Sequence, residues 1–206
     1  GQTLPDKEIH LINGEKIVSL ISDAEIRFSA DGDAFVTDGM NRNKTLGLKK
    51  DQTNKLIVPF GKRSILRLAD GTKIWLNSGT ELEFPSQFNG ERREIRMQGE
   101  LYLEVAKSGE KPFIVHTPRM SVWVYGTSFN ISAYKEDSEQ SVVLVEGSVQ
   151  VNKNDKSLKL APNQMAKITR TGMEKATVDV SEYISWKNGV LIFRKAPISD
   201  ILQKVG

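Results

Sequence analysis

The chain has 206 residues, of which 38% are hydrophobic and 27% charged, values typical of a folded protein with a real core. Its 29 basic and 26 acidic residues leave a net charge of +3, too small to create the field of a nucleic-acid-binding protein. The absence of cysteine excludes a disulfide scaffold, a cysteine-ligated zinc site and a thiol nucleophile. No apolar run is long enough to span a bilayer. The first residues lack the pattern of a signal peptide, and we expect the chain to be an excised part of a longer protein.

Residues 1–60 are predicted to form short strands separated by turns. Asn-Gly at 13–14 and Asp-Gly at 31–32 and 38–39 favour hairpins, because these pairs tolerate positive φ. The polar, basic stretch 41–54 is predicted to be an exposed loop. The aspartates at 31, 33 and 38 suggest calcium, but Arg42 stands where the twelfth ligand would be acidic, so solvated turns explain them better.

From residue 56 to about 170 the chain alternates between apolar and polar residues. Leu101, Leu103 and Val105, for example, alternate with Glu100, Tyr102 and Glu104. A period of two predicts strands with one buried face and one wet face. The runs are short, similar in length and separated by glycines. They predict an all-β fold of stacked short strands, solenoid-like or sandwich-like, rather than a closed ligand barrel.

The pattern changes near residue 186. An apolar run at 190–193 predicts one more strand, and Pro197 then opens a segment with Ile198, Ile201, Leu202 and Val205 on one helical face. This amphipathic segment is the only helix that the sequence predicts.

Candidate sites for chemistry are few. His10 and His116 lie far apart and have no soft ligand beside them, so we predict no metal and no cofactor. Glu100 and Glu104, at i and i+4 on one strand face, could be an acid–base pair of a glycosidase. Alternating carboxylates on a wet strand face are the simpler interpretation, and we expect no enzyme.

Four aromatic residues occupy the polar phase of their strands: Trp75, Tyr102, Trp123 and Tyr125. They could form a platform that stacks sugars or partner side chains. If both faces of the sheets are covered, they are instead core, and we favour core for most of them.

Residues 61–170 resemble the FecR family. The matching segments are G-K-R-S (61–64), D-G-T with W-L-N (70–77), F-P-S-Q-F (84–88), R-R-E-I-R-M-Q-G-E (92–100), P-F-I-V-H-T (112–117), G-T-S-F-N-I-S-A-Y (126–134), L-V-E-G-S-V-Q-V (144–151) and L-A-P-N-Q-M-A (160–166). Tyr125 stands where the family commonly has an aliphatic residue. Asn163 replaces a common turn glycine, and asparagine tolerates the same positive φ.

Residues 181–206 resemble the start of a small α+β C-terminal lobe, similar to the secretin and TonB short N-terminal fold, in the Bacteroidetes branch of the family. The chain is therefore divided into an N-terminal β segment (1–60), a FecR-like β domain (61–180) and the truncated start of this lobe (181–206).

The resemblance implies the periplasmic part of a single-pass inner-membrane anti-sigma factor, with the membrane segment and the cytoplasmic sigma-binding region absent from this chain. It implies that the signalling domain of a TonB-dependent outer-membrane transporter binds this part, and that an ECF-type sigma factor is controlled. We expect partner contacts at Trp186, Leu191, Phe193, Ile198 and Ile201. A secreted carbohydrate-binding β module, using the aromatic face around Trp75 and Trp123, is the alternative.

Overall fold

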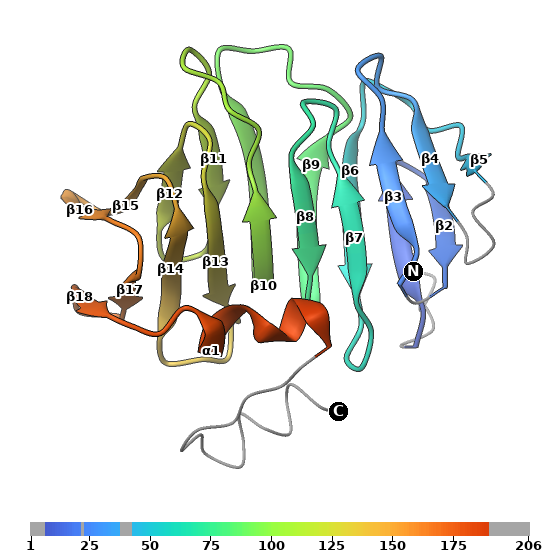
Figure 1. Ribbon diagram of the computed structural model, residues 1–206. Helices are drawn as coiled ribbons and strands as arrows, with labels where there is room; N and C mark the ends of the chain where they lie inside the picture. The colour runs from blue at the N-terminus through green and yellow to red at the C-terminus, as the bar shows by residue number, and fades with distance from the viewer. Residues whose placement is uncertain (1–6, 22, 38–42, 190–206) are drawn as a thin grey trace.

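The computed structural model describes residues 7–21, 23–37 and 43–189. These residues are mostly strands, with one short α-helix near the C-terminus, which confirms the all-β prediction (Figure 1). Within these ranges no helix is long and apolar enough to cross a membrane. The strands are β1 (Ile9–Asn13), β2 (Lys16–Leu20), β3 (Glu25–Phe28), β4 (Ala34–Thr37), β5 (Asn43–Thr45), β6 (Thr53–Val58), β7 (Ser64–Arg67), β8 (Lys73–Leu76), β9 (Thr80–Pro85), β10 (Arg93–Glu104), β11 (Phe113–His116), β12 (Ser121–Val124), β13 (Ser128–Ala133), β14 (Gln140–Glu146), β15 (Val149–Lys153), β16 (Lys156–Leu160), β17 (Gln164–Ile168) and β18 (Met173–Thr177).

The strands form two long sheets that face each other across one core. Sheet A has the order β2-β1-β6-β9-β10-β11-β12-β15-β16. Sheet B has the order β5-β4-β3-β7-β8-β10-β13-β14-β17-β18. Beyond β10 the chain adds hairpins alternately to the two sheets, so the fold is a sandwich that grows along its length as a solenoid does.

Strand β10 belongs to both sheets. Its first half pairs with β9 and β11 in sheet A, and its second half pairs with β8 and β13 in sheet B. Gly99 lies where the strand passes from one sheet to the other, at φ +106°. A Cβ there would lie 2.6 Å from the Cα of Thr80, so only glycine fits this crossing.

The core consists of the inward-facing residues of both sheets, and it follows the alternation in the sequence. Leu66, Ile74, Leu101, Leu103 and Phe129 of sheet B are all fully buried in the same cluster as the inward-facing residues of sheet A. The strands before residue 60 belong to the same two sheets. The predicted loop at 41–54 is wrong in part, because it contains β5 and the start of β6, with Leu46 and Asn54 buried.

The Asp70-Gly71-Thr72 turn forms a buried ionic network with the first residue of β10. The Arg93 guanidinium lies 2.7 Å from the Asp70 carboxylate and donates to the carbonyls of Ala106 and Lys111 at 2.8–3.1 Å. Asp70 also accepts bonds from the Thr72 amide and hydroxyl. Because Arg93 is 3% exposed, this network fixes the connection between β10 and β11 to the rest of the sandwich.

The C-terminal part of the described chain is helical where the sequence predicted no helix. An α-helix, α1 (Ser181–Ile184), continues into a 3₁₀ helix, η1 (Ser185–Asn188), which ends at Gly189 in the left-handed region. Asp179 accepts bonds from the amide and hydroxyl of Ser181 just before α1. The predicted strand at 190–193 and the predicted helix from Pro197 lie outside the described residues.

Candidate functional site: the dock of the C-terminal segment on sheet B

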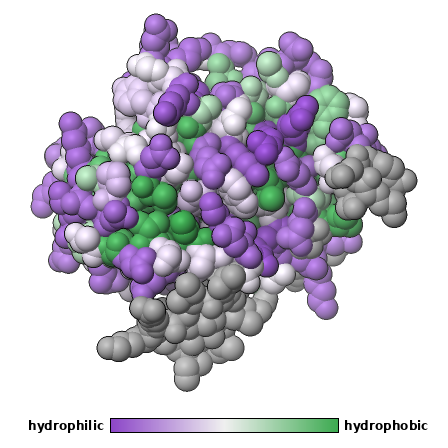
Figure 2. Space-filling model, viewed as in Figure 1, coloured by the Kyte–Doolittle hydropathy of each residue, from purple (hydrophilic) through white to green (hydrophobic). Residues whose placement is uncertain are grey.

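The outer face of sheet B carries one continuous row of side chains across its width. Strand registers place these residues side by side in the order Glu25, Ile65, Trp75, Tyr102, Asn130, Val143, Met165 and Ala176. From β3 to β17, an adjacent residue on each strand points into the core, so this row faces outward. Figure 2 shows an apolar area on this face over β13 and β14, next to α1.

The α1–η1 segment lies across this face, in front of the strands on either side of β10 (Figure 1). Trp186 is 4% exposed, and its indole Nε1 donates to Asn130 Oδ1 at 3.1 Å. Arg63, from the turn before β7, donates from Nη1 to the Trp186 carbonyl at 2.7 Å. The β sandwich therefore binds both the side chain and the backbone carbonyl of Trp186. We call this contact the dock.

Beneath the dock lies a buried carboxylate. Glu100 is 2% exposed, and its two oxygens accept bonds from Asn130 Nδ2 at 3.0 Å and Asn77 Nδ2 at 2.8 Å. Among the described residues no cation lies within ion-pair distance of it. The prediction that Glu100 lies on a wet strand face is wrong, because Glu100 is buried and both of its oxygens are bound by amide donors.

The hydrogen bonds of this network have a fixed direction. An ionised carboxylate only accepts, so both asparagines must turn their NH₂ groups toward Glu100. Asn77 then offers Oδ1 to the Ser78 amide at 2.9 Å, and Asn130 offers Oδ1 to Trp186. The charge of Glu100 thereby sets the side-chain orientation that binds the indole of Trp186.

Two tyrosines near the network are also buried. The Tyr134 hydroxyl donates to the Ser78 carbonyl at 2.8 Å, and burial, followed by the nearby Glu100 charge, raises the pKa of Tyr134 well above its ordinary value. Lys187 lies over the Tyr102 ring at 3.9 Å from its centroid. Burial, assisted by the charge of Glu104, also raises the pKa of Tyr102. The dock therefore combines an indole anchor with a cation–π contact.

The two glutamates predicted as an alternative catalytic pair have different environments. Glu104 is exposed and lies 3.8 Å from Lys187, whereas both oxygens of Glu100 are occupied by amide donors. His116 pairs with Glu94 at 2.7 Å, and His10 lies on β1 near Ser19. The part of the chain that the structure describes contains no group of three or more metal-ligating side chains.

The four outward aromatic residues do not form one platform. Trp75 is on the outer face of sheet B, and Trp123 is on the outer face of sheet A, on the opposite side of the sandwich. The expectation that most of the four are core is also wrong. Only Tyr102 is buried, Trp75 and Trp123 are half-buried, and Tyr125 is 53% exposed.

Of the five residues predicted to contact a partner, the structure describes Trp186 alone. In this conformation it binds the chain's own sheet B, through residues that sequence reasoning did not connect with it. Leu191, Phe193, Ile198 and Ile201 lie outside the described residues. One signal could have indicated the dock: Asn77, Glu100 and Asn130 each occupy a polar position inside a FecR-like segment.

Comparisons with known proteins relate the β sandwich to one protein family and to solved structures. The profile of the family described as FecR protein matches residues 54–150, a range that includes Asn77, Glu100 and Asn130 and ends before α1. Two crystal structures from Parabacteroides distasonis ATCC 8503, both described as anti-sigma factors, are similar in sequence and fold. One is 32% identical over 74% of each chain with a TM-score of 0.71. The other is 33% identical over 73% of this chain and 74% of that chain, with a TM-score of 0.70. No curated protein matches the chain.

Proposed function

Because this chain belongs to the FecR family of anti-sigma regulators, we propose that it is the periplasmic signal-relay part of a single-pass inner-membrane anti-sigma factor. In this proposal it receives the signalling domain of a TonB-dependent outer-membrane transporter and controls an ECF-type sigma factor through a cytoplasmic region outside this chain. The role is protein–protein interaction, and it requires no catalysis, cofactor or nucleic acid.

The dock is the observation that carries the proposal. A relay needs an element with two states whose balance a partner can shift. The α1–η1 segment fits this requirement, since it joins the β sandwich to everything that follows residue 189. Its docking buries the indole of Trp186, which is favourable, and orders the segment, which costs conformational entropy. Opposing contributions of this kind keep the difference between docked and released states small.

We propose that the transporter's signalling domain binds the chain from residue 181 onward and changes the occupancy of the dock. Leu191, Phe193, Ile198 and Ile201 are the proposed contacts beyond the dock. Trp186 is proposed to participate through its release from Asn130. Met165, an apolar residue of the same outward row, is half-buried and offers additional contact area on this face.

The test measures how tightly the signalling domain encoded by the adjacent transporter gene binds the periplasmic region, with and without residues 181 onward. We expect loss of at least tenfold in affinity on truncation, because the proposed contacts lie in that segment. Ile17→Thr, at an exposed position on β2, is the control and should bind as the wild type does. Equal affinity of the truncated and intact proteins would contradict the proposed contact. Binding of an oligosaccharide instead of the signalling domain would favour the carbohydrate-binding alternative.

A further inference from the structure

A second surface lies on the outer face of sheet A, on the opposite side of the sandwich from the dock. It is a groove of about 520 Å³ over β12, β15 and β16, and its lining includes Lys107, Gly109, Trp123, Tyr125, Gln150 and Lys159. Neither the family match nor the dock accounts for it. We infer that this groove binds an extended, acidic segment of a partner protein.

The groove is built from elements that are held in place before any partner arrives. Its wall is the connection between β10 and β11, which the buried Arg93 fixes through the carbonyls of Ala106 and Lys111. The Ser108 amide also donates to the Tyr125 carbonyl at 2.8 Å, which joins the wall to the end of β12. A preformed wall lowers the entropy cost of binding.

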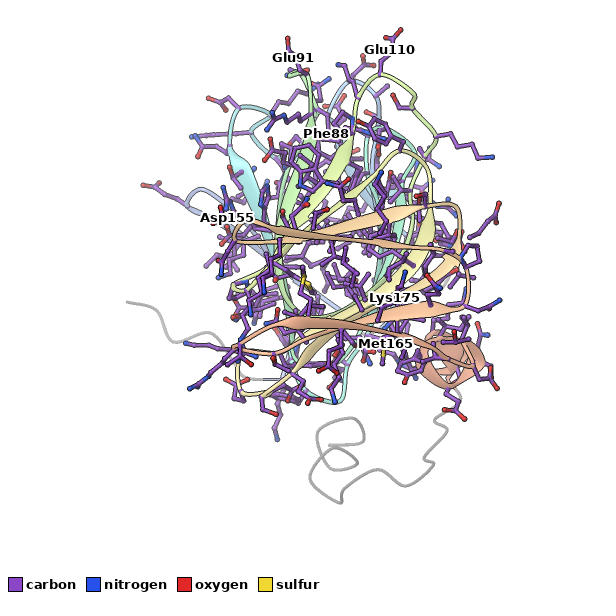
Figure 3. The ribbon with its side chains drawn as sticks, turned by 90° about the vertical axis from the view of Figure 1, so that its left-hand side faces the viewer. Phe88, Glu91, Glu110, Asp155, Met165 and Lys175 are labelled. Carbon is purple, nitrogen blue, oxygen red and sulfur yellow. The ribbon has the colours of Figure 1, made fainter. Side chains whose placement is uncertain are left out.

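The charge of the groove favours an anionic occupant. Its lining holds Lys107 and Lys159 and contains no carboxylate. Glu110 belongs to the same connection, but it points outward from the top of the molecule in Figure 3 and does not line the groove. Arg92 adds a further positive charge, with its guanidinium 5.3 Å from the centre of the Trp123 ring.

The aromatic residues favour a protein over a free ion. Trp123 lies on β12, Tyr125 follows directly after this strand, and both line the groove. Tryptophan, tyrosine and arginine are the residues most enriched at the energetic centres of protein interfaces. Tyr125 is 53% exposed, a large aromatic surface that the folded chain leaves open.

The strand registers indicate an extended segment. Trp123, Gln150 and Lys159 form one outward row across sheet A, and this row ends on β16. β16 pairs with β15 alone among the described strands, and it lies beside β18 at this end of the sandwich, where Figure 3 labels Asp155 in the β15–β16 turn and Lys175 on β18. An extended segment that lies in the groove along this row contacts Trp123 and Gln150 and can place a carboxylate next to Lys159.

The chain itself offers a clean test, because its three tryptophans give three indole N–H signals in a ¹⁵N-resolved NMR spectrum. The probes are a ten-residue peptide of alternating glutamate and valine, the same peptide with glutamine for glutamate, and an oligogalacturonate. We expect the acidic peptide to shift the Trp123 signal and leave the Trp186 signal unchanged. The glutamine peptide should bind at least tenfold more weakly, and added salt should lower the affinity of the acidic peptide.

Gly109→Glu is the blocking variant, because Gly109 lines the groove and a Cβ there meets no atom within 4 Å, so the fold tolerates a side chain at this position. This variant should lower the affinity for the acidic peptide at least tenfold. Gly172→Glu adds the same charge at a glycine that is equally open, outside the groove, and should leave affinity unchanged. Four results would each overturn the inference: no shift of Trp123, equal binding of both peptides, equal binding of both glycine variants, or tighter binding of oligogalacturonate than of the acidic peptide.

Discussion

Arg93→Met is expected to lower the free energy of unfolding by about 3–5 kcal/mol, because it leaves the Asp70 carboxylate and two carbonyls without their cation in a buried site. For a chain of this size the midpoint of thermal unfolding should fall by on the order of 10 °C. Chemical denaturation followed by circular dichroism measures the effect directly. Methionine keeps much of the length of the side chain, so the loss reports the lost interactions more than a cavity.

Arg67→Met is the matched control for this prediction. Arg67 also pairs with a carboxylate, that of Glu25, but both side chains are about one-third exposed or more. A solvent-exposed ion pair contributes at most about 1 kcal/mol. If Arg93→Met costs no more than Arg67→Met, the Asp70–Arg93 network does not stabilise the sandwich as we describe.

Glu100→Gln is expected to destabilise the dock by about 1–3 kcal/mol although the two side chains have nearly the same shape. Glutamine presents an NH₂ group where Glu100 only accepts, so either Asn77 or Asn130 must turn over. Turning Asn130 places its NH₂ against the Trp186 N–H, and turning Asn77 places its NH₂ against the Ser78 amide. Hydrogen exchange at residues 181–189 should therefore become faster.

A double-mutant cycle with Trp186→Phe distinguishes this account from a general loss of stability. Phenylalanine has no N–H, so Asn130 can turn over freely, and Glu100→Gln should cost less in that background. We expect a coupling of about 0.5–3 kcal/mol between the two sites. Additive effects would mean that Glu100 does not act on Trp186 through Asn130.

The sandwich could be predicted from the sequence because local patterns determine most of it. Alternation identifies the buried phase of β8, β10 and β13, and Asn163 adopts the positive φ of +65° that its place in a turn suggested. The passage of β10 between the sheets could not be predicted, since Gly99 resembles an ordinary turn glycine. Only pairing partners distant along the chain show that the strand continues through it.

The dock was not predictable for a related reason. Trp75 and Tyr102 occupy the phase that faces water in a bare sheet, and Lys187, from the segment at residues 181–188, lies over both rings. Alternation carries no information on what covers an outer face. Trp186 could be singled out from the sequence as a contact residue, but its partner in the described structure is Asn130 of the same chain.

The most direct test of the relay follows the indole signal of Trp186 in the periplasmic region as the transporter's signalling domain is added. If that domain acts through the dock, the Trp186 signal should move at saturation toward the position it has in Glu100→Gln, and hydrogen exchange at residues 181–189 should change with it. A complex that is fully formed while the Trp186 signal and this exchange stay as they are in the free protein would contradict the account.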